Sequence, residues 1–377
     1  MNIKIKKQGL KILNVIFVAN VFIYLLSCLT AYISPANFFL FTFLALGFPL
    51  LLISIIFWII FFFFYKKKRS FLLLFFLLLG YKNILSTVGF NFKNNTNTLN
   101  RESTFRVLSW NVEAFLYQVK KYDSANGGLR KMMSFIGDSK ADVICIQDFE
   151  QIYKSEYFQF IDYIRDSLKY PYTYLSADID TVTIWGHCKY GTCIFSRHPI
   201  IKTGRVQYSG NSFTESLGYA DITIQNRQIR FFNTHLRSMY LNINSSYTKN
   251  NFKYVIEDTN IVFHSSILEK LKHFDTAHCS QASIIKKVMD TTKIPFVFCA
   301  DLNSVPSSYT YHKISKNLND AFVQKGFGWG GTYSSRLPFL RIDVVLMNSQ
   351  LTTNNYFSPR LELSDHYPVL VDISFVK

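Results

Sequence analysis

The sequence predicts an α/β domain that follows an N-terminal bundle of two to three transmembrane helices. Residues 1–90 are dominated by Phe, Leu and Ile, whereas residues 91–104 are polar and show no apolar periodicity. From residue 105 to residue 377, short β-rich runs alternate with helical stretches. We therefore predict a membrane anchor over 1–90, a linker over 91–104 and a globular domain over 105–377.

Three apolar segments make up the anchor, at about 12–33, 38–64 and 71–90. The first two each exceed the roughly 20 residues that a helix needs to cross the hydrocarbon core. The third is the weakest, because polar residues, Lys82 among them, interrupt it. The first segment is too long for a cleavable signal peptide, and a second one follows it closely. A buried hairpin of a soluble protein is disfavoured, because it would need a partner to cover every face of the phenylalanines at 61–64.

Lysine and arginine residues set the expected orientation of the anchor. Four lysines lie in the first eleven residues and a basic cluster follows the second segment at 66–69, whereas the loop at 34–37 carries no charge. The positive-inside rule places both basic clusters in the cytoplasm. Three crossings would then put the globular domain on the other side. We expect an integral protein of a bacterial inner membrane with its domain in the periplasm.

The net charge of +16 belongs mostly to the anchor. Ten of the 41 basic residues and none of the 25 acidic residues lie in the first hundred positions, which leaves a net charge of +6 for the rest of the chain. This charge is compatible with substrates that carry phosphate, but alone it is weak support for nucleic-acid binding. Five cysteines lie beyond the anchor. We expect them to be reduced, with a Cys188–Cys193 disulfide as the alternative.

Polar residues recur where the predicted strands end. We predict strands at 105–112, 142–147, 191–195, 229–234, 295–300, 342–347 and 368–375, and helices at 129–139, 265–274 and 281–288. The strand ends carry the sequences WNV (110–112), QD (147–148), NTHL (233–236), DLN (301–303) and SDHYP (364–368), and RID (341–343) begins a strand. Each motif alone is weak, because a lone Asn, Asp or His usually caps a turn or is a satisfied polar residue. A scaffold built of strands would present all of them at one rim.

Together and in this order, the motifs resemble those of the endonuclease/exonuclease/phosphatase superfamily, over about residues 105–377. That group includes deoxyribonucleases, neutral sphingomyelinases and inositol polyphosphate 5-phosphatases. The resemblance implies a four-layer α/β sandwich, in which helices flank two mixed β-sheets. It also implies a hydrolase that cleaves a phosphodiester or a phosphomonoester by metal-assisted attack of an activated water. His235 favours the deoxyribonuclease, sphingomyelinase and phosphatase branches over the abasic-site endonucleases, which lack a His at that point.

The implied metal ion explains the acidic residues of the motifs. A phosphodiester is anionic, so attack by water needs charge neutralisation, and Mg²⁺ or Mn²⁺ suits a site of oxygen ligands. By resemblance, Asp148 takes the position of the metal-binding acid, Asn111 lies beside it to hold metal-bound water or phosphate, and Asp365 could support the metal or its waters. The family usually has Glu where this chain has Asp148, which puts the metal affinity in question. Glu150 is the reserve ligand, because it would share a strand face with Asp148 if the strand continues.

The other roles that the resemblance implies concern the water and the phosphate. Asp301 would orient and deprotonate the attacking water, and Asn303 would hydrogen-bond a phosphate oxygen. His366 would contact the phosphate and stabilise its developing charge, while Asp343 would fix the tautomer of His366. His235 would donate a hydrogen bond to the phosphate from the opposite side.

Several alternatives stay open at the level of sequence. The substrate could be nucleic acid, the head group of a phospholipid or sphingolipid, or a phosphomonoester, because a fold alone does not define a substrate. The chain could also be a membrane-anchored binding or scaffold protein with a degenerate site, although only Asp148 departs from the family pattern. Residues 237–278 form either a substrate lid or a surface insertion with its own small core.

Overall fold

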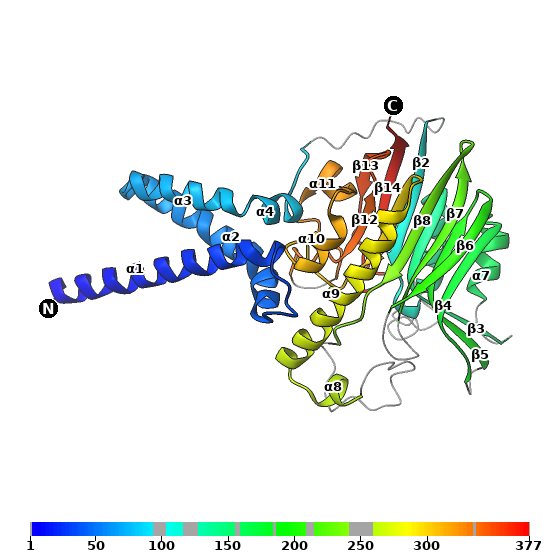
Figure 1. Cartoon of the computed structure of the whole chain (residues 1–377), viewed down its shortest axis with the longest axis horizontal. Helices are drawn as coiled ribbons and strands as arrows, with labels where there is room; N and C mark the ends of the chain where they lie inside the picture. Colours follow the sequence, from blue (N-terminus) through cyan, green and yellow to red (C-terminus); the bar gives the residue numbers. More distant parts are fainter. Residues whose placement is uncertain are drawn as a thin grey trace.

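Two six-stranded β-sheets pack face to face in the computed structural model, and helices cover their outer faces (Figure 1). The predicted four-layer α/β sandwich is therefore confirmed. The N-terminal helices extend from one side of this sandwich (Figure 1). The structure describes residues 2–92, 103–115, 127–154, 159–183, 186–208, 215–240, 259–334 and 337–376.

The first sheet is mixed, because β2 and β3 run parallel whereas its other neighbouring strands are antiparallel. In spatial order its strands are β13 (Leu351–Phe357), β14 (Val369–Phe375), β2 (Thr104–Asn111), β3 (Val143–Tyr153), β5 (Gly186–Ser196) and β4 (Tyr172–Thr183). The strand β3 continues well beyond the predicted 142–147, across a β-bulge between Ile146 and Phe149. This continuation brings Asp148 and Glu150 into one strand.

The second sheet is also mixed, with β8 and β9 as its parallel pair. In spatial order its strands are β10 (Asn319–Asp320), β12 (Asp343–Met347), β9 (Phe296–Asp301), β8 (Arg227–His235), β7 (Ser216–Ile224) and β6 (Ile200–Gln207). Because parallel neighbours end at the same edge of a sheet, the C-terminal residues of β8 and β9 lie side by side.

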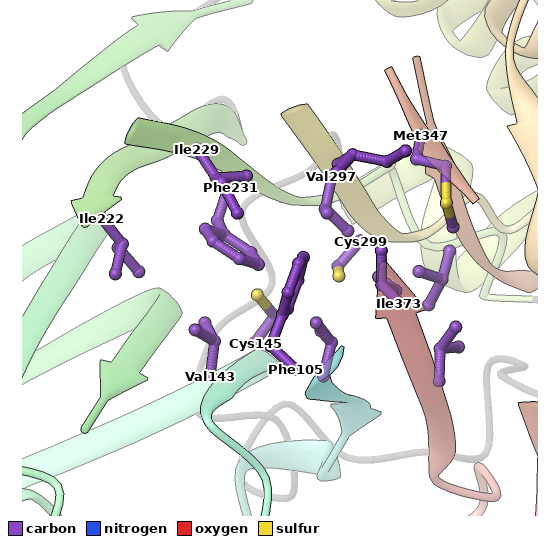
Figure 2. Close-up of a cluster of buried hydrophobic side chains, with 14 of the residues drawn as sticks. Phe105, Val143, Cys145, Ile222, Ile229, Phe231, Val297, Cys299, Met347 and Ile373 are labelled. Atoms are coloured by element: carbon purple, nitrogen blue, oxygen red, sulfur yellow. The ribbon is translucent and has the colours of Figure 1, made fainter. Parts of the chain in front are cut away.

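Apolar side chains from the inner faces of both sheets fill the space between them (Figure 2). The rings of Phe105 and Phe231, from opposite sheets, lie 6.1 Å apart in an edge-to-face arrangement. Along β2, Phe105 and Val107 face this core, whereas Leu108 and Trp110 face the helices outside. All six cysteines are free and buried, as expected for reduced structural thiols.

Helices cover both outer faces of the sandwich. The first sheet is covered by α6 (Gly128–Asp138), and the second by α9 (Ile267–Thr291) and α10 (Tyr309–Ser315). Short helical elements complete the domain, namely η2 (Glu113–Phe115), α7 (Phe160–Asp162), the π-helical turn η4 (Tyr163–Ser167), α8 (Thr259–His264) and α11 (Ala321–Lys325). A small antiparallel sheet of β1 (Gly89–Phe90) and β11 (Phe327–Gly328) joins the end of the anchor to the domain.

The helix α9 is a single element where the sequence predicts two helices, at 265–274 and 281–288. It begins with a capping box in which Ser266 and Glu269 bond reciprocally. Its middle turns bury Asp275 and His278. Because these two polar residues interrupt the apolar periodicity, the sequence pattern divides a helix that the backbone does not divide.

Two helices of the anchor are long and apolar enough to span a membrane, over Gln8–Ala31 and Leu40–Tyr65. The elements of the anchor are α1 (Asn2–Ser27), η1 (Cys28–Ala31), α2 (Leu40–Tyr65), α3 (Lys67–Leu79) and α4 (Tyr81–Thr87). A bend of 69° separates α3 from α4, so this pair forms either a broken span or a re-entrant segment. The third crossing stays a prediction. So do the domain boundaries, because most of the predicted linker lies outside the described residues.

Candidate functional site

Three of the predicted site residues lie side by side in the second sheet. His235 ends β8, Asp301 ends β9, and the two residues pair in parallel register. Asp343 begins the antiparallel neighbour β12 and pairs with Asp301 from the other side. The topology of the sheet is therefore sufficient to bring these three side chains to one edge.

The first sheet supplies the opposite wall of the site. Asn111 ends β2, and Asp148 lies in the β3 bulge directly after Gln147, the parallel partner of Asn111. Asp365 and His366 come shortly before β14 begins. One continuous set of contacts joins all eight side chains that the sequence singles out: Asn111, Asp148, His235, Asp301, Asn303, Asp343, Asp365 and His366.

Asp301 lies at the centre of the site and is fully buried. Its Oδ2 accepts a hydrogen bond of 2.9 Å from Asn111 Nδ2, and its Oδ1 accepts one of 2.9 Å from the backbone N–H of Asn303. The Nε2 atoms of His235 and His366 lie 3.4 Å and 3.6 Å from Oδ2. Burial would raise the pKa of Asp301, but the two histidines and the N–H of Asn303 lower it below its usual value. Asp301 is therefore an ionised carboxylate between two imidazoles.

His366 and Asp343 form a buried imidazole–carboxylate pair. Nδ1 of His366 lies 2.9 Å from Oδ2 and 3.1 Å from Oδ1 of Asp343. Thr332 Oγ1 accepts the backbone N–H of Asp343 at 3.1 Å, and Trp110 Nε1 donates to the carbonyl of His366 at 3.0 Å, so both partners are held in place. Burial would lower the pKa of His366, but the charges of Asp343 and Asp301 raise it to about 10.

Asp148 is held by a histidine and a tyrosine. Its Oδ1 lies 2.9 Å from His235 Nδ1, and the hydroxyl of Tyr190 on β5 donates a hydrogen bond to it. Asp148 has a φ of +50° within the bulge, a conformation that Asp adopts more readily than most residues. Burial would raise its pKa, but the charge of His235 and the bonds from His235 and Tyr190 lower it. The bulge thus redirects the side chain of Asp148 towards β8.

Glu150, the reserve ligand, lies on the continuation of β3. It pairs with Tyr190, the residue whose hydroxyl contacts Asp148, so it shares the face of the strand that carries the site. Its Oε1 lies 3.6 Å from the Sγ of Cys188, which is two residues from Tyr190 along β5 and therefore on the same face. The predicted extended geometry is therefore present, while the carboxylate of Glu150 lies next to a thiol.

Sequence analysis missed several residues around the site. A small pocket beside Asp148 and His235 is lined by further acidic and tyrosine side chains, namely Asp178, Tyr190, Glu215 and Tyr240. Burial raises the pKa of Asp178 to about 7. These residues come from β4, β5 and the segments next to β7 and β8. Only the register between strands brings them together, so no local sequence motif could indicate them.

The site holds more negative charge than its histidines can balance, on carboxylates that are buried or, for Asp148 and Asp365, 16% and 32% exposed. Four carboxylates converge there, those of Asp148, Asp301, Asp343 and Asp365. Even with both imidazoles protonated, two negative charges stay uncompensated. Burial raises the pKa of Asp365, and the neighbouring charges of Asp148 and Asp301 raise it further against the effect of His366. A divalent cation would supply the missing charge, so the residues fit the metal ion that the sequence predicts.

Three of these residues also form a compact candidate group by distance alone. One ligand atom from each of Asp301, Asp343 and His366 lies within 4.8 Å of the others. The predicted metal ligands are different residues, Asp148, Asn111 and Asp365, so their role as ligands stays a prediction.

Known structures share this architecture. An endonuclease/exonuclease/phosphatase from Beutenbergia cavernae is similar with a TM-score of 0.53 and 18% identity, over 72% of each chain. The human Nocturnin catalytic domain with bound sulfate has a TM-score of 0.49 and 15% identity, over 74% of this chain and 96% of that one. An endonuclease/exonuclease/phosphatase from Bacteroides vulgatus has a TM-score of 0.49 and 18% identity, over 73% of this chain and 100% of that one. No curated protein matches the chain.

The fold is that of a family whose members are hydrolases acting on phosphoester bonds. A family model described as the endonuclease/exonuclease/phosphatase family matches residues 108–366, well over half of the chain. The chain belongs to this family, whose members generally use a divalent metal. A second model, described as a domain of unknown function (DUF8431), matches residues 8–87.

Proposed function

We propose that the chain hydrolyses a phosphoester by attack of an activated water, in a reaction that depends on Mg²⁺ or Mn²⁺. The observation that carries this proposal is the position of Asp301, a buried carboxylate with an imidazole Nε2 on either side at 3.4 Å and 3.6 Å. A carboxylate can accept a proton from water, and flanking imidazoles can donate to the oxygens of a phosphate bound at the same point. No observation on the described residues favours a degenerate site.

In this proposal Asp301 orients the attacking water and takes its proton. His366 keeps its own proton at neutral pH, because its pKa is raised to about 10, and its Nε2 donates to a phosphate oxygen. Asp343 holds the opposite nitrogen of that ring at 2.9 Å. His235 donates from the other side of the phosphate. Asn303 lies beside it, with Nδ2 3.0 Å from His235 Nε2, and binds another phosphate oxygen.

Asp148, Asn111 and Asp365 would hold the cation. When bound, it would neutralise charge on the phosphate and make the phosphorus more open to attack. The compact group of Asp301, Asp343 and His366 has another role in this proposal, because Asp343 already holds Nδ1 of His366 at 2.9 Å and Asp301 accepts the proton of the water.

We further propose that the catalytic domain lies outside the cytoplasm, in the periplasm. The N-terminal end of α1 and the junction of α2 with α3 both lie at the end of the anchor far from the domain (Figure 1). There Arg69 Nη1 lies 3.1 Å from Asn14 Oδ1, three residues after Lys11, so the cluster at 66–69 lies beside the N-terminal half of α1. Both basic clusters can therefore lie on the cytoplasmic side while the domain lies on the other side.

Reporter fusions test this orientation. Alkaline phosphatase and green fluorescent protein are each fused to the C-terminus in a bacterial host. Phosphatase activity with a dark fluorescent fusion supports the proposed topology. A bright fluorescent fusion with an inactive phosphatase would reverse it and place the active site in the cytoplasm.

The substrate class is tested on the full chain in detergent with Mg²⁺ present. The candidates are DNA, a phospholipid, a sphingolipid and a phosphomonoester, because a phosphate at this site could belong to any of them. Release of product by the wild type, and not by Asp301→Asn, from at least one of these supports the function. If neither protein releases product from any of them, the proposed function is wrong.

A further inference from the structure

The membrane anchor contacts the catalytic domain at the loop that follows Asn303. This loop, residues 304–308, connects the Asp301-Leu302-Asn303 motif to α10. The carbonyl of Ser307, the fourth residue after Asn303, faces the anchor and lies 2.6 Å from Thr30 Oγ1 in η1, closer than the carbonyl of Ser27 at 2.8 Å, the other acceptor of the same hydroxyl proton. A buried polar contact therefore joins the end of the first membrane helix to the loop that directly follows two of the site residues.

Two further hydrogen bonds connect the same loop to other helices of the anchor. Ser86 Oγ in α4 donates to the carbonyl of Pro306 at 2.9 Å. The hydroxyl of Ser307 donates to the carbonyl of Ala45 in α2 at 2.7 Å. Ser86 and Ser307 are both buried. Three separate elements of the anchor thus hold two consecutive residues of the loop.

The catalytic domain holds the other end of this loop. Ser304 Oγ lies 3.1 Å from Nδ1 of the buried His278 in α9, and the Nε2 of His278 lies 2.7 Å from the carbonyl of Arg237. Asn303 itself has a φ of +45°, a left-handed conformation that Asn adopts more readily than most residues. The loop is therefore clamped between α9 on one side and the anchor on the other.

A second catalytic segment also reaches the anchor. Arg341, two residues before Asp343, is 1% exposed. Its NH2 donates to the carbonyl of Ser86 at 2.7 Å, and its NH1 donates to Asp320 at 3.0 Å. Ser86 therefore bonds the loop after Asp301 through its hydroxyl and the segment before Asp343 through its carbonyl.

The helix α10, which follows the loop, is bonded to the anchor as well. Asn83 in α4 accepts a hydrogen bond of 2.8 Å from His312 Nε2 and donates one of 2.9 Å to Thr30 Oγ1. Burial, together with the charge of Lys82, lowers the pKa of His312 to about 4, so the ring is neutral and its Nε2–H is the donor. The side chain of Asn83 therefore bonds both Thr30, which contacts the loop, and His312 in α10, which follows the loop.

We propose that the membrane anchor is a positioning element of the active site, in which Thr30 and Ser86 hold the loop after Asn303 and the segment before Asp343. This inference rests on the proposed function for the meaning of that site. It gives a role to residues 8–87, which match a domain of unknown function and include every anchor residue named in these contacts. The anchor then serves catalysis in addition to attaching the chain to the bilayer.

An anchor that only attached the domain to the bilayer would not need a polar interface with the catalytic segments. A buried polar group without a partner destabilises the folded chain, so the buried hydroxyls and amides of an interface need partners placed opposite them. Here those partners belong to the segments that carry Asp301, Asn303 and Asp343. Displacing a catalytic group by about 1 Å can lower a rate about 100-fold, so a fixed loop has a direct consequence for the reaction.

The test replaces Thr30 by Val in the full chain, which keeps the side-chain shape and removes the hydroxyl. Two quantities are measured in detergent: kcat on the best substrate, and hydrogen exchange of the amides at 301–308. We expect kcat to fall about 10-fold or more with KM nearly unchanged, and exchange at 301–308 to increase. Thr30→Ser, which restores the hydroxyl, should return both to the wild-type values. Ser86→Ala serves as a second variant if Thr30→Val does not fold.

Tyr24→Phe is the matched control. It removes a buried hydroxyl that bonds the carbonyl of Leu77 at 3.0 Å within the anchor and touches no residue of the loop. It should leave kcat and exchange at 301–308 as in the wild type. Unchanged exchange or unchanged kcat in Thr30→Val would overturn the inference, and so would an equal loss of kcat in Tyr24→Phe. A wild type without any phosphoesterase activity would instead refute the proposed function, and the exchange measurement alone would then decide whether the anchor holds the loop.

Discussion

Asp343 Oδ2 lies 2.9 Å from Nδ1 of His366; both residues are buried, and the rings of His366 and Tyr333 are T-shaped to each other with their centroids 5.1 Å apart. The two residues come from different sheets, since Asp343 begins β12 and His366 precedes β14. A carboxylate in this position fixes the tautomer of the imidazole and leaves the opposite nitrogen, Nε2, directed at Asp301 at 3.6 Å. The catalytic role proposed for His366 therefore depends on Asp343.

The first prediction is that Asp343→Asn lowers kcat by about 100-fold while the chain stays folded. Asn has nearly the shape of Asp, but it carries no charge to hold the protonated imidazole and can force the wrong tautomer. The measurement is kcat at saturating substrate, with the melting temperature as the check on folding. Asp138→Asn, on the exposed surface of α6, is the control and should be fully active. Wild-type kcat in Asp343→Asn would show that the pair has no part in the reaction.

The second prediction concerns the metal. EDTA should abolish activity, and added Mg²⁺ or Mn²⁺ should restore it, because four carboxylates and an amide offer hard oxygen ligands. Zn²⁺ should restore activity less well, since no thiolate lies among the site residues. Activity is measured before and after chelation and after each metal is added back. Full turnover in excess chelator would contradict the metal-dependent mechanism.

The third prediction distinguishes Asp148 from Glu150 as the metal ligand. Asp148→Glu should be tolerated, because it introduces the residue that the family usually has there. Asp148→Ala should need a much higher concentration of Mg²⁺ for half-maximal activity. Glu150→Ala should change that concentration little, because the Glu150 carboxylate lies next to Cys188. A larger effect of Glu150→Ala than of Asp148→Ala would exchange the two assignments.

The fourth prediction concerns stability at acidic pH. The pKa of His312 falls from 6.5 to about 4 on folding, because burial and Lys82 disfavour the charged ring. Its contribution to stability is complete above pH 6.5 and is lost as the pH falls towards 4, and it amounts to at most about 3 kcal/mol. His312→Gln, which can still donate to Asn83, should lose less stability over that window. The melting temperatures of both proteins between pH 7 and pH 4.5 provide the check, and parallel curves would contradict the prediction.

The strand-end motifs predicted which residues form the site, because the topology of the sheets brings the ends of these strands together. His235, Asp301 and Asp343 lie in register on neighbouring strands, so pairing of these strands alone makes the three motifs neighbours. The contacts of Asp148 could not be predicted in this way. They depend on a bulge that rotates its side chain and on the register that brings Tyr190 opposite Glu150. Local patterns do not encode bulges of this kind.

The sequence also did not predict that the anchor packs against the catalytic domain. The apolar pattern predicted a third span over 71–90 with Lys82 near its middle. In the structure the helix bends at Gly80, where a Cβ would overlap the hydroxyl of Tyr24. Lys82 lies 4.4 Å from the ring of Tyr32, next to the catalytic domain. The polar residues that weakened the predicted span include Asn83, which bonds His312. Hydropathy alone cannot separate an interrupted span from a docked segment.

Asp301 is the centre of the proposed mechanism, so the decisive measurement is kcat of the full chain after Asp301→Asn, with Mg²⁺ saturating. The substitution keeps the shape of the side chain and removes the charge that would accept the proton of the attacking water. We predict a loss of at least about 100-fold, matched by His366→Ala, while Asp138→Asn keeps wild-type turnover. Near-wild-type turnover in Asp301→Asn would show that the water is activated elsewhere, and the assignment of the active site would be wrong.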